Sequence, residues 1–528
     1  MTTSASPREP TPTDRLLAAL GGLLSGFVSL AVAELVVAAA RPEASPVAAV
    51  GGAAIDLAPV GLKNWAIRSF GENDKIVLQT GILTVLAVLA ALVGVLALRH
   101  RLAGAAAVLA FGVVGAVAAV NRPDSDSFTD ALPSLIGAVA GAALLYALIG
   151  RLLAPRPGTS PDRAASADRR GFLLVAASTA VAATVAGALG RALGGTRSRD
   201  AVTSRDTLRL PRPASAAPAV PAGAQLRVPG ISPFVTPNKD FYRVDTALIV
   251  PKVDADGWRL RINGLGVTGE PMLSLDDLFR REVVERDITL ACVSNEVGGP
   301  YVGNARWLGV RLADLLREFG VKAPSEGGPA DQIVARSADG MTIGTPVEAV
   351  LDGRDALLAF GMNGAPLPFE HGFPVRMVVP GLYGYVSACK WIVDIELTTF
   401  DAYDAYWVPR GWAARAPVKT QARIDTPRSF ARPEAGTVPV AGVAWAPHRG
   451  VRRVEVRIDD GHWQEAELGA EDSRDTWRQW VYRWQAEPGR HTLTVRATDG
   501  TGQVQTERRA GTVPDGATGW HSVVVNVV

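Results

Sequence analysis

Hydrophobic positions divide the chain into two contrasting parts. In the first 190 residues they form long runs rich in Ala, Leu, Val and Gly, at about 16–40, 76–98, 102–120, 132–150 and 171–190. Each run is close to the ~20 residues that an α-helix needs to cross a bilayer. Glu34 is the only charge deep inside any of them. The pattern predicts an N-terminal domain, 1–190, of about five transmembrane helices.

Beyond residue 230 the hydrophobic runs become short and mixed. Trp258, Leu260 and Ile262 alternate with arginines, as in a half-buried strand. The apolar run that ends at Cys292 predicts a buried strand, and the apolar spacing that starts at Leu312 predicts a helix. This mixture predicts an α+β domain over 231–424.

The last hundred or so residues alternate regularly between apolar and polar positions. One run leads into Asp459-Asp460-Gly461 and another into Asp499-Gly500, and strands closed by Asp-Gly turns are typical of hairpins. With several tryptophans, this predicts an all-β, immunoglobulin-like sandwich over 425–528. Residues 191–230, rich in Pro, Ala, Arg and Ser without a hydrophobic period, predict an exposed linker.

Charges between the predicted helices indicate an orientation. The loop 121–131 carries three aspartates and one arginine. The connections on the other side carry Arg99, His100 and Arg101, and then Arg151, Arg156, Arg163, Arg169 and Arg170. The positive-inside rule therefore predicts a cytoplasmic N-terminus, with everything after the fifth helix on the extracytoplasmic side of a cell membrane.

The fifth segment opens with Ser166-Ala-Asp-Arg169-Arg170-Gly-Phe172-Leu173-Leu174. This run resembles a twin-arginine export signal placed inside the chain. Two ordinary positive-inside arginines would give the same pattern, and both interpretations stay open here. An export signal would mean that the downstream domain acquires its cofactor in the cytoplasm.

Composition excludes several classes of function. A net charge of +2 offers no basic surplus for nucleic acid. Two cysteines make neither a disulfide framework nor a zinc site, although a single Cys292–Cys389 disulfide stays open. His100 is the only histidine in the first 200 residues, which argues against a bis-histidine haem between the predicted helices. We therefore interpret these helices as a membrane anchor or docking surface.

Cys292 is the first candidate for chemistry. It stands at the end of a predicted strand and faces a loop that holds Gly298, Gly299 and Gly303. Folds present ligands and nucleophiles at such positions. The alternative is a buried core thiol, since free cysteine is among the most buried residue types.

The second candidate is the segment 363–391. It places His371, Arg376 and Lys390 around a predicted buried strand that is bracketed by Pro and Gly turns. Cationic side chains beside tight glycine turns suit a phosphate or another dense anion. The alternative is three surface charges on loops.

Three blocks together resemble the sulfite oxidase family of molybdopterin-dependent oxidoreductases. They are Thr236-Pro-Asn with Phe241-Tyr242-Arg243, Cys292 with Gly303-Asn304-Ala-Arg306-Trp307, and Pro366-Leu-Pro through His371-Gly-Phe-Pro-Val-Arg376 to Lys390-Trp391. The run from Gly442 to Trp463 is similar to the dimerisation domain of that family. The resemblance covers roughly 230–528. It implies a Mo-molybdopterin cofactor and a homodimer.

The resemblance also implies roles for individual residues. Cys292 matches the one protein thiolate that binds molybdenum, for which a soft sulfur ligand is suitable. His371, Arg376 and Lys390 match residues that hold the pterin phosphate. Arg243 matches an arginine near the metal that orients an oxyanion such as sulfite. Cys292 and Arg243 are thus the expected catalytic residues.

Four further positions match cofactor contacts in the family: Phe241, Tyr242, Asp339 and Cys389. The chain also departs from the family near the expected substrate pocket. Trp412 stands where animal and plant sulfite oxidases place a tyrosine beside the metal. Val386 or Ser387 replaces an arginine that is expected after a glycine. These changes concern the substrate rather than the cofactor.

The activity implied is a two-electron oxygen-atom transfer on sulfite or a related small substrate. No haem or iron–sulfur motif is present in the sequence, so electrons would leave to a separate acceptor protein such as a cytochrome. One alternative is a sulfoxide reductase that uses the same cofactor. The others are a non-enzymatic, membrane-anchored binding module and a cysteine hydrolase in which His371 activates Cys292.

Overall fold

Two units make up the chain. One comprises Met1–Asp200 with Ala247–Val250, and the other comprises Ala201–Thr246 with Pro251–Val528. The computed structural model describes residues 11–39, 44–58, 74–122, 125, 127–153, 161–247 and 249–528.

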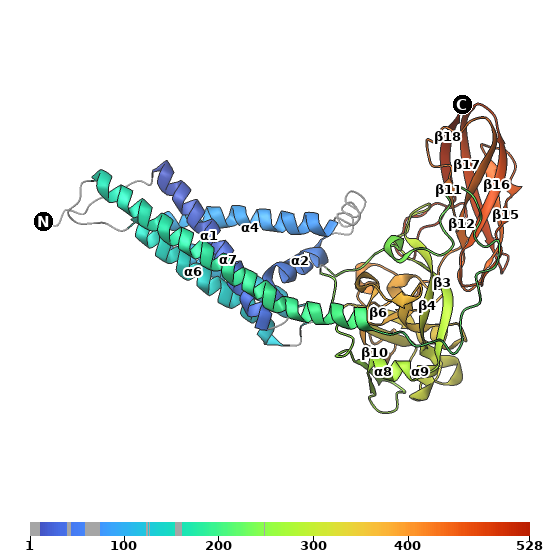
Figure 1. Ribbon diagram of the computed structural model, residues 1–528, viewed down its shortest axis with the longest axis horizontal. Coiled ribbons are helices and arrows are strands. Elements are labelled where there is room, and N and C mark those ends of the chain that lie inside the picture. The colour runs from blue at the N-terminus through green and yellow to red at the C-terminus, as the bar shows by residue number, and fades with distance from the viewer. Residues whose placement is uncertain are drawn as a thin grey trace. The chain divides into compact units, whose positions relative to one another are not determined.

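The described part of the first unit is built from helices. They are α1 (Pro12–Ala39), α2 (Pro46–Leu57), α4 (Asp74–Arg99), α5 (Arg101–Val120), the 3-10 turn η3 (Phe128–Ala131), α6 (Leu132–Leu153) and most of α7 (Pro161–Thr207). Helix α1 packs against α4 and α6 (Figure 1). Apolar side chains of α1, α6 and α7 share small cores. A side chain on Gly22 would lie 2.0 Å from the Ala90 carbonyl oxygen. Only glycine permits this close approach of α1 and α4.

Five helical segments among the described residues are long and apolar enough to cross a membrane. They are Pro12–Ala38, Ile76–Arg99, Arg101–Val120, Phe128–Leu153 and Gly171–Gly190. They confirm the five predicted apolar helices, although residue 40 of the predicted 16–40 lies outside the described residues. The sequence analysis missed α2, whose 12 residues extend only about 18 Å at helical rise. That length is too short to cross a bilayer.

The predicted exposed linker over 191–230 is wrong for its first part, which is helical, whereas 208–230 is irregular and mostly exposed or half-buried. Helix α7 continues to Thr207, and Arg169 and Arg170 lie inside it. In its last turns Arg205 donates from Nε to the Leu367 carbonyl at 2.8 Å. The following Pro-rich stretch lies along the edge of a sheet, where Ser215 pairs with Val284 in a parallel bridge. Composition indicated a linker because these contacts are with residues distant in the sequence.

The next part of the second unit is a mixed α/β domain with two sheets. Their strand orders are β2-β1-β10-β5-β6 and β3-β4-β7-β8, and β9 pairs with β7. The strands are β1 (Leu260–Gly264), β2 (Met272–Leu273), β3 (Val283–Ala291), β4 (Val302–Arg311), β5 (Gln332–Ser337), β6 (Thr342–Pro346), β7 (Leu357–Met362), β8 (Ala365–Pro366), β9 (Arg376–Val378) and β10 (Ile392–Thr398). The helices are α8 (Leu275–Phe279), α9 (Leu312–Glu318) and α10 (Val347–Leu351), and the 3-10 turns are η4 (Asn238–Asp240), η5 (Pro324–Glu326), η6 (Phe369–His371), η7 (Gly384–Val386) and η8 (Val408–Arg410).

The predicted strand before Cys292 and the helix at Leu312 are both confirmed, as β3 and α9. Strand β3 is buried over its last five residues, which matches its unbroken apolar run. Its neighbour β4 contributes the fully buried Trp307. The indole of Trp307 donates to the Ile288 carbonyl at 3.1 Å, which anchors β4 to β3 just ahead of the cysteine.

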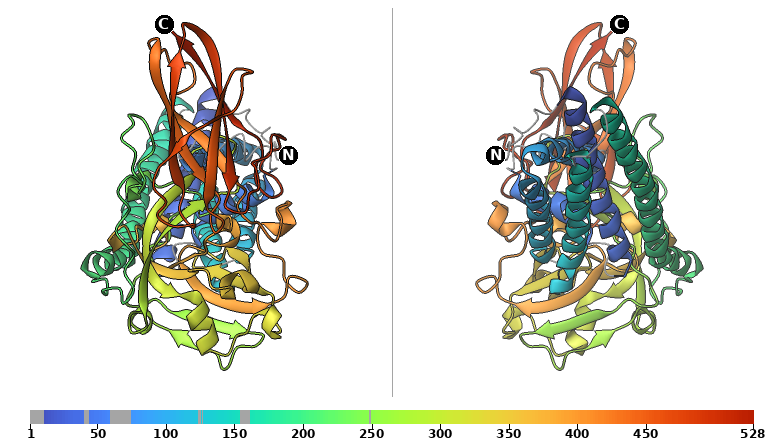
Figure 2. Two further views of the ribbon diagram at one scale, coloured as in Figure 1. Left: turned by 90° about the vertical axis from the view of Figure 1, so that its right-hand side faces the viewer. Right: turned by 90° about the vertical axis from the view of Figure 1, so that its left-hand side faces the viewer.

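The C-terminal region is all-β, as predicted (Figure 2). Its two four-stranded sheets have the orders β11-β12-β16-β15 and β14-β13-β17-β18. The strands are β11 (Gln421–Thr426), β12 (Gly436–Trp445), β13 (Val451–Ile458), β14 (Gln464–Glu465), β15 (Glu467–Leu468), β16 (Arg478–Ala486), β17 (Gly489–Asp499) and β18 (His521–Val527). Side chains of both sheets, among them Val440, Trp480 and Leu493, form one core. Strand β11 begins at Gln421, so the predicted boundary at 425 cuts through it.

Candidate functional site

Cys292 directly follows β3 and is buried, with 8% of its surface exposed. Both Cys292 and Cys389 are free thiols, so the disulfide left open by the sequence is not formed. The Ser294 N–H points at the Cys292 Sγ from 3.4 Å. Burial raises the pKa of Cys292, while the hydrogen bonds from Ser294 and then the Lys390 ammonium act in the opposite direction. The free thiol is therefore protonated at neutral pH, and a metal must displace that proton to bind the sulfur.

Arg376 opens β9 and is buried. Its Nη1 donates to the His371 carbonyl at 3.1 Å, and its guanidinium lies 5.0 Å from the centre of the Trp307 ring. Burial lowers the pKa of Arg376 to about 10, so it remains charged at neutral pH. Its Nε is buried without a hydrogen-bond partner. A buried cation with an unsatisfied N–H fits an anionic group of a ligand.

His371 ends the 3-10 turn η6, next to Arg376 in space. Its Nε2 lies 3.0 Å from the Asn238 carbonyl oxygen, which assigns the proton to Nε2 and leaves Nδ1 as an acceptor. Burial, and then the Arg376 charge, lower the pKa of His371 to about 4. The imidazole is therefore neutral, so it is not a third cation beside Arg376 and Lys390.

Asp245 joins Lys390 to Arg243. One of its carboxylate oxygens accepts from the Lys390 Nζ at 2.9 Å and from the Arg243 Nε at 2.9 Å. Only 2% of the Asp245 side chain is exposed, against 11% for Lys390 and 30% for Arg243. The sequence analysis did not single out Asp245, although it lies only two residues after Arg243. Arg243, Arg376 and Lys390 are hereafter called the cation cluster.

Gly372 explains how two members of the cation cluster meet. Its φ is +106°, and a side chain there would lie 3.0 Å from the Arg376 Cβ and 3.1 Å from the Lys390 Cα. A residue with a Cβ would be strained in this conformation and would separate the two basic side chains. Gly372 therefore allows the segments of Arg376 and Lys390 to cross closely.

Aromatic side chains connect Cys292 with the cation cluster. Phe241 stacks on Tyr242 with 5.2 Å between ring centres and meets the His371 ring edge-on at 5.5 Å. Burial raises the pKa of Tyr242, and an ionised Cys292 acts in the same direction. The Tyr242 ring also lies 6.3 Å from that of Tyr301. Phe241 and Tyr242 thus lie between the thiol and the basic side chains.

Cys389 and Asp339 complete the set that the sequence singled out. Burial raises the pKa of the Cys389 thiol, and the Asp339 carboxylate adds to the effect, while Arg376 and Lys390 oppose it. Asp339 lies in the turn between β5 and β6 and accepts from the Met341 N–H at 3.3 Å. The structure therefore brings all nine predicted site residues into one neighbourhood.

Trp412 belongs to an adjacent aromatic group. Its ring centre lies 5.7 Å from that of Tyr385 and 6.3 Å from that of Trp407. Tyr385 follows Gly384, where a side chain would come within 3.8 Å of the Tyr242 hydroxyl. Trp412 is therefore related to the site through Tyr385 and the Gly384 turn.

The contacts of His371 argue against the cysteine-hydrolase alternative. Its Nε2 is held by a backbone carbonyl and its ring by Phe241. Burial raises the pKa of Cys292, whereas a nucleophilic cysteine needs a lowered one. Within the described part of the chain, no group of three or more His, Cys, Asp or Glu side chains is arranged to hold a metal. The donor set instead comprises one thiol, two buried basic groups and a neutral imidazole, which fits an anionic cofactor that brings its own metal ligands.

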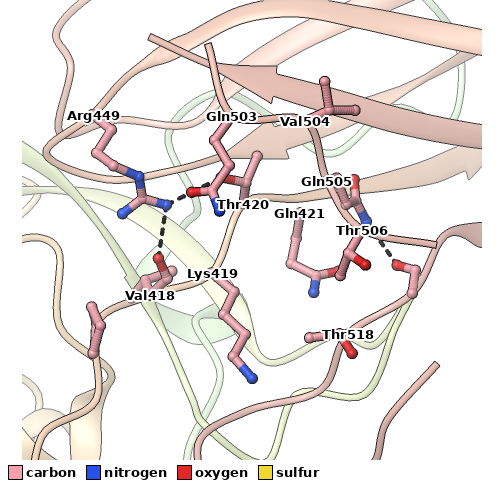
Figure 3. Close-up of a pocket in the computed structure, with 12 residues that line it drawn as sticks. Val418, Lys419, Thr420, Gln421, Arg449, Gln503, Val504, Gln505, Thr506 and Thr518 are labelled. Atoms are coloured by element: carbon pink, nitrogen blue, oxygen red, sulfur yellow. Dashed lines mark hydrogen bonds between the residues drawn. The ribbon is translucent and has the colours of Figure 1, made fainter. Parts of the chain in front are cut away.

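A separate pocket of about 390 Å³ lies between 417–421 and the connection that joins β17 to β18 (Figure 3). Arg449 and Lys419 line it, together with Gln421, Gln505 and Thr506. The Arg449 Nε is bound to Asp499 at 2.8 Å and the Lys419 Nζ to Asp515 at 2.8 Å. None of the predicted site residues lines this pocket.

Comparison with known proteins gives consistent matches. Residues 247–407 match the family described as "Oxidoreductase molybdopterin binding domain". Mouse mitochondrial sulfite oxidase is 31% identical over 344 residues, which cover 56% of this chain and 62% of that protein. The uncharacterized oxidoreductase YuiH of Bacillus subtilis (strain 168) is 33% identical over 162 residues, which cover 31% of this chain and 75% of YuiH.

Among solved structures, the sulfane dehydrogenase SoxCD of Paracoccus pantotrophus is similar, with 24% identity and a TM-score of 0.48, over 56% of this chain and 84% of that one. The chain spans about 62% of the length of the mouse and rat sulfite oxidases. The matched domain, 247–407, contains Cys292 and Lys390 and begins just after Arg243 and Asp245.

Proposed function

The chain belongs to the sulfite oxidase family of molybdopterin-dependent oxidoreductases, and on that premise we propose that it catalyses a two-electron oxygen-atom transfer on a small sulfur substrate such as sulfite. Sulfite would gain one oxygen atom from water, with release of two protons and two electrons. A separate protein, such as a cytochrome, would accept the electrons. Bound Mo-molybdopterin supplies a metal centre that changes its oxidation state by two units during such a reaction.

The unsatisfied Arg376 Nε is the observation that carries this proposal. Only 5% of the Arg376 surface is exposed, and one of its N–H groups has no hydrogen bond. Burying such a charge is unfavourable unless an anion neutralises it and accepts that hydrogen bond. Lys390, on the other side of Gly372, supplies a second positive charge. Arg376 and Lys390 would hold the cofactor phosphate, and the Nδ1 of His371 would accept a hydrogen bond from a donor group of the pterin.

The other residues take roles that follow from their positions. Cys292, at the end of a rigid strand, would bind the metal as a thiolate after losing its proton. Arg243 is the most exposed member of the cation cluster, with 30% of its side chain accessible, and would orient an oxyanion substrate. Asp245 restricts Arg243 and Lys390 to one arrangement. Phe241 and Tyr242 would cover one side of the cofactor and exclude water.

We also propose that the five apolar helices cross a cell membrane and that the second unit lies on its extracytoplasmic side. The arginines between the fourth and fifth helices and the aspartates of 121–131 support this orientation. The C-terminal region would be an immunoglobulin-like domain that pairs two copies of the chain. Two antiparallel sheets around a shared core support the first part, and the resemblance of Gly442–Trp463 to a dimerisation domain supports the second.

Elemental analysis and a substrate assay test the proposal. Purified chain should contain about one molybdenum atom per copy and should reduce ferricyanide when sulfite is added. Cys292→Ser should lose this turnover, and Arg490→Ala, an exposed change at the start of β17, should keep it. Absence of molybdenum from wild-type protein produced in a host that makes the cofactor would contradict the proposal and would favour a non-enzymatic module.

A sulfoxide reductase would run the transfer in the opposite direction. Turnover of methionine sulfoxide with a reduced dye, measured on the same molybdenum-loaded sample, separates the two directions. We expect sulfite oxidation to be the faster reaction, because Arg243 favours an anionic substrate over a neutral sulfoxide.

A further inference from the structure

The nine residues after Cys292, 293–301, form the cysteine loop. The loop is closed by short-range hydrogen bonds. The Cys292 N–H donates to the Tyr301 carbonyl at 2.9 Å, the Asn295 N–H donates to the Cys292 carbonyl at 3.1 Å, and the Tyr301 N–H donates to the Asn295 Oδ1 at 2.8 Å. At the tip, Gly298-Gly299, the Gly299 N–H also donates to the Glu296 carbonyl at 2.8 Å. The tip has further contacts outside the loop.

Residues of the C-terminal sheets hold that tip. Arg423, in β11, donates from Nη1 to the Gly299 carbonyl at 2.9 Å. Gly298, with φ +80°, lies so close to His521, the first residue of β18, that a side chain there would come within 2.2 Å of its ring. His521 is fixed in turn, because its Nδ1 accepts from the Ile424 N–H at 3.0 Å.

Arg423 uses three different nitrogens for three partners. Besides Gly299, it binds the Asp425 carboxylate through Nε at 2.7 Å and the Ser232 hydroxyl through Nη2 at 3.0 Å. Its side chain is 11% exposed and that of Asp425 is 7% exposed. Asp425 also accepts from the Ser232 N–H at 2.9 Å. The planar guanidinium is therefore rigidly oriented, and the single ammonium of a lysine has no geometry that reproduces all three contacts.

The strand before Cys292 is held from the same side. The Thr289 N–H donates to the Asp475 carbonyl at 2.9 Å, and the Trp477 N–H donates to the Thr289 Oγ1 at 2.7 Å. The Trp477 indole reaches the Phe234 carbonyl at 2.8 Å. Asp475 and Trp477 immediately precede β16. The C-terminal region thus contacts the chain both before and after the thiol.

We propose that the C-terminal β region positions the metal-binding thiol, with Arg423 and His521 as positioning residues that keep the cysteine loop closed over Cys292. This inference rests on the proposed function. It gives the C-terminal region a role inside each chain, in addition to its proposed role in pairing two chains. Without these contacts the loop would open, and Cys292 would lose its fixed place beside the cation cluster. Neither residue touches substrate or cofactor. Their effect is on the geometry of the ligand.

The first test measures the thiol itself, in full-length protein produced without cofactor. Wild type, Arg423→Lys and Arg496→Lys are treated with a thiol reagent, and peptide mapping separates labelling of Cys292 from that of Cys389. Arg496 is the matched control, because it lies in the same region and its Nε binds Glu455 at 2.9 Å. Loss of one charge-assisted hydrogen bond should open the loop about tenfold more often. Labelling of Cys292 should therefore accelerate about tenfold in Arg423→Lys and stay unchanged in Arg496→Lys.

A second variant changes the contact between the cysteine loop and the C-terminal region on the loop side. Gly298→Ala places a methyl group against the His521 ring and should accelerate labelling of Cys292 in the same way. Combining it with His521→Ala removes the steric conflict and should give less than the sum of the two single effects. Wild-type labelling rates in folded Arg423→Lys and Gly298→Ala proteins would overturn the proposal.

Cofactor-loaded samples separate this inference from the proposed function. If wild type binds molybdenum, Arg423→Lys should retain the metal yet give an altered Mo(V) electron paramagnetic resonance spectrum, because the thiolate is less well oriented. An unchanged spectrum would overturn the positioning role while leaving the proposed function standing. Absence of molybdenum from wild type would overturn the proposed function, whereas the labelling result would still report on the loop contacts.

Discussion

Replacement of Asp245 by asparagine gives the most quantitative test of the candidate site. The carboxylate lies between the Arg243 Nε and the Lys390 Nζ, at 2.9 Å from each, with 2% of its side chain exposed. Asparagine keeps the shape and one acceptor oxygen but removes the negative charge. Both hydrogen bonds then change from charge-assisted to charged–neutral contacts, and two cations are left without a counter-ion between them.

The expected loss of stability is about 2 kcal/mol. Hydrogen bonds to charged groups contribute about 1.5–3 kcal/mol. A bond between two charged partners lies at the upper end of this range and one from a cation to a neutral acceptor at the lower end, so each of the two bonds loses roughly 1 kcal/mol. Arg243 is 30% exposed, so water screens part of its share and the repulsion between the cations adds little. For a unit of this size, about 2 kcal/mol corresponds to a fall in melting temperature of roughly 4 °C.

Melting followed by tryptophan fluorescence measures this change, because all tryptophans except Trp65 follow residue 250 and report on the second unit. Glu467→Gln is the control, since that carboxylate is 59% exposed in its ion pair with Arg483. It should shift the transition by less than about 1 °C. Equal shifts in melting temperature for Asp245→Asn and Glu467→Gln would refute the argument that burial makes the Asp245 ion pairs stabilising. In loaded enzyme, Asp245→Asn should raise the KM for sulfite more than it lowers kcat, because Arg243 loses its fixed orientation.

Three further predictions concern the thiol, the buried guanidinium and pH. Cys292→Ser should fold normally but retain at most about a tenth of the molybdenum measured by elemental analysis, because a hydroxyl is a harder and less acidic ligand than a thiol. Arg376→Met should leave the melting temperature of cofactor-free protein unchanged or raised, since it removes a buried charge, yet lower the pterin content about tenfold or more. Burial holds the pKa of His371 and His521 at about 4, so between about pH 6.5 and 4 the unfolded chain binds protons that the folded chain does not, and stability falls as pH falls. Each histidine contributes at most about 3 kcal/mol to this loss of stability. The difference between melting temperatures at about pH 7.5 and pH 5 measures the loss. Replacing the exposed His462 by alanine is the control and should leave this difference unchanged.

The sequence predicted those parts of the fold that depend on local periodicity. The strand before Cys292 and the helix at Leu312 are consequences of apolar spacing within a dozen residues, and both are present. The five apolar helices follow from run length in the same way. The Pro-rich stretch after α7 has no such period. Its place against the start of β3 depends on Val283 and Val284, which lie about seventy residues further along the chain.

For the candidate site, too, the sequence predicted what depends on local pattern and missed what depends on long-range contacts. The residue types needed to bind an anion beside a thiol are visible in the sequence, and the structure brings them together. The neutral state of His371 was not predictable, because it follows from burial and from the nearby Arg376 charge. The role of Asp245 depends on its distance from Lys390, which is 145 positions away in the sequence. The sequence gives no local indication of Arg423 and His521, since their contacts with the cysteine loop are with Gly299 and Gly298, more than 120 positions away.

Two groups of the candidate site are unfavourable to bury. The Cys292 thiol is buried and protonated, and the Arg376 guanidinium is buried with one N–H unsatisfied. Other contacts must offset this loss of stability. They include the aromatic contacts of Phe241 and Trp307 and the close crossing of two segments at Gly372. A single anionic cofactor with a thiolate-binding metal would relieve both costs at once. Because such a ligand binds only the folded chain, its binding energy adds to the stability of the second unit. Cys292 and Arg376 therefore lower the stability of the fold when no ligand is bound. The same two residues make the site selective for an anionic ligand that carries a metal.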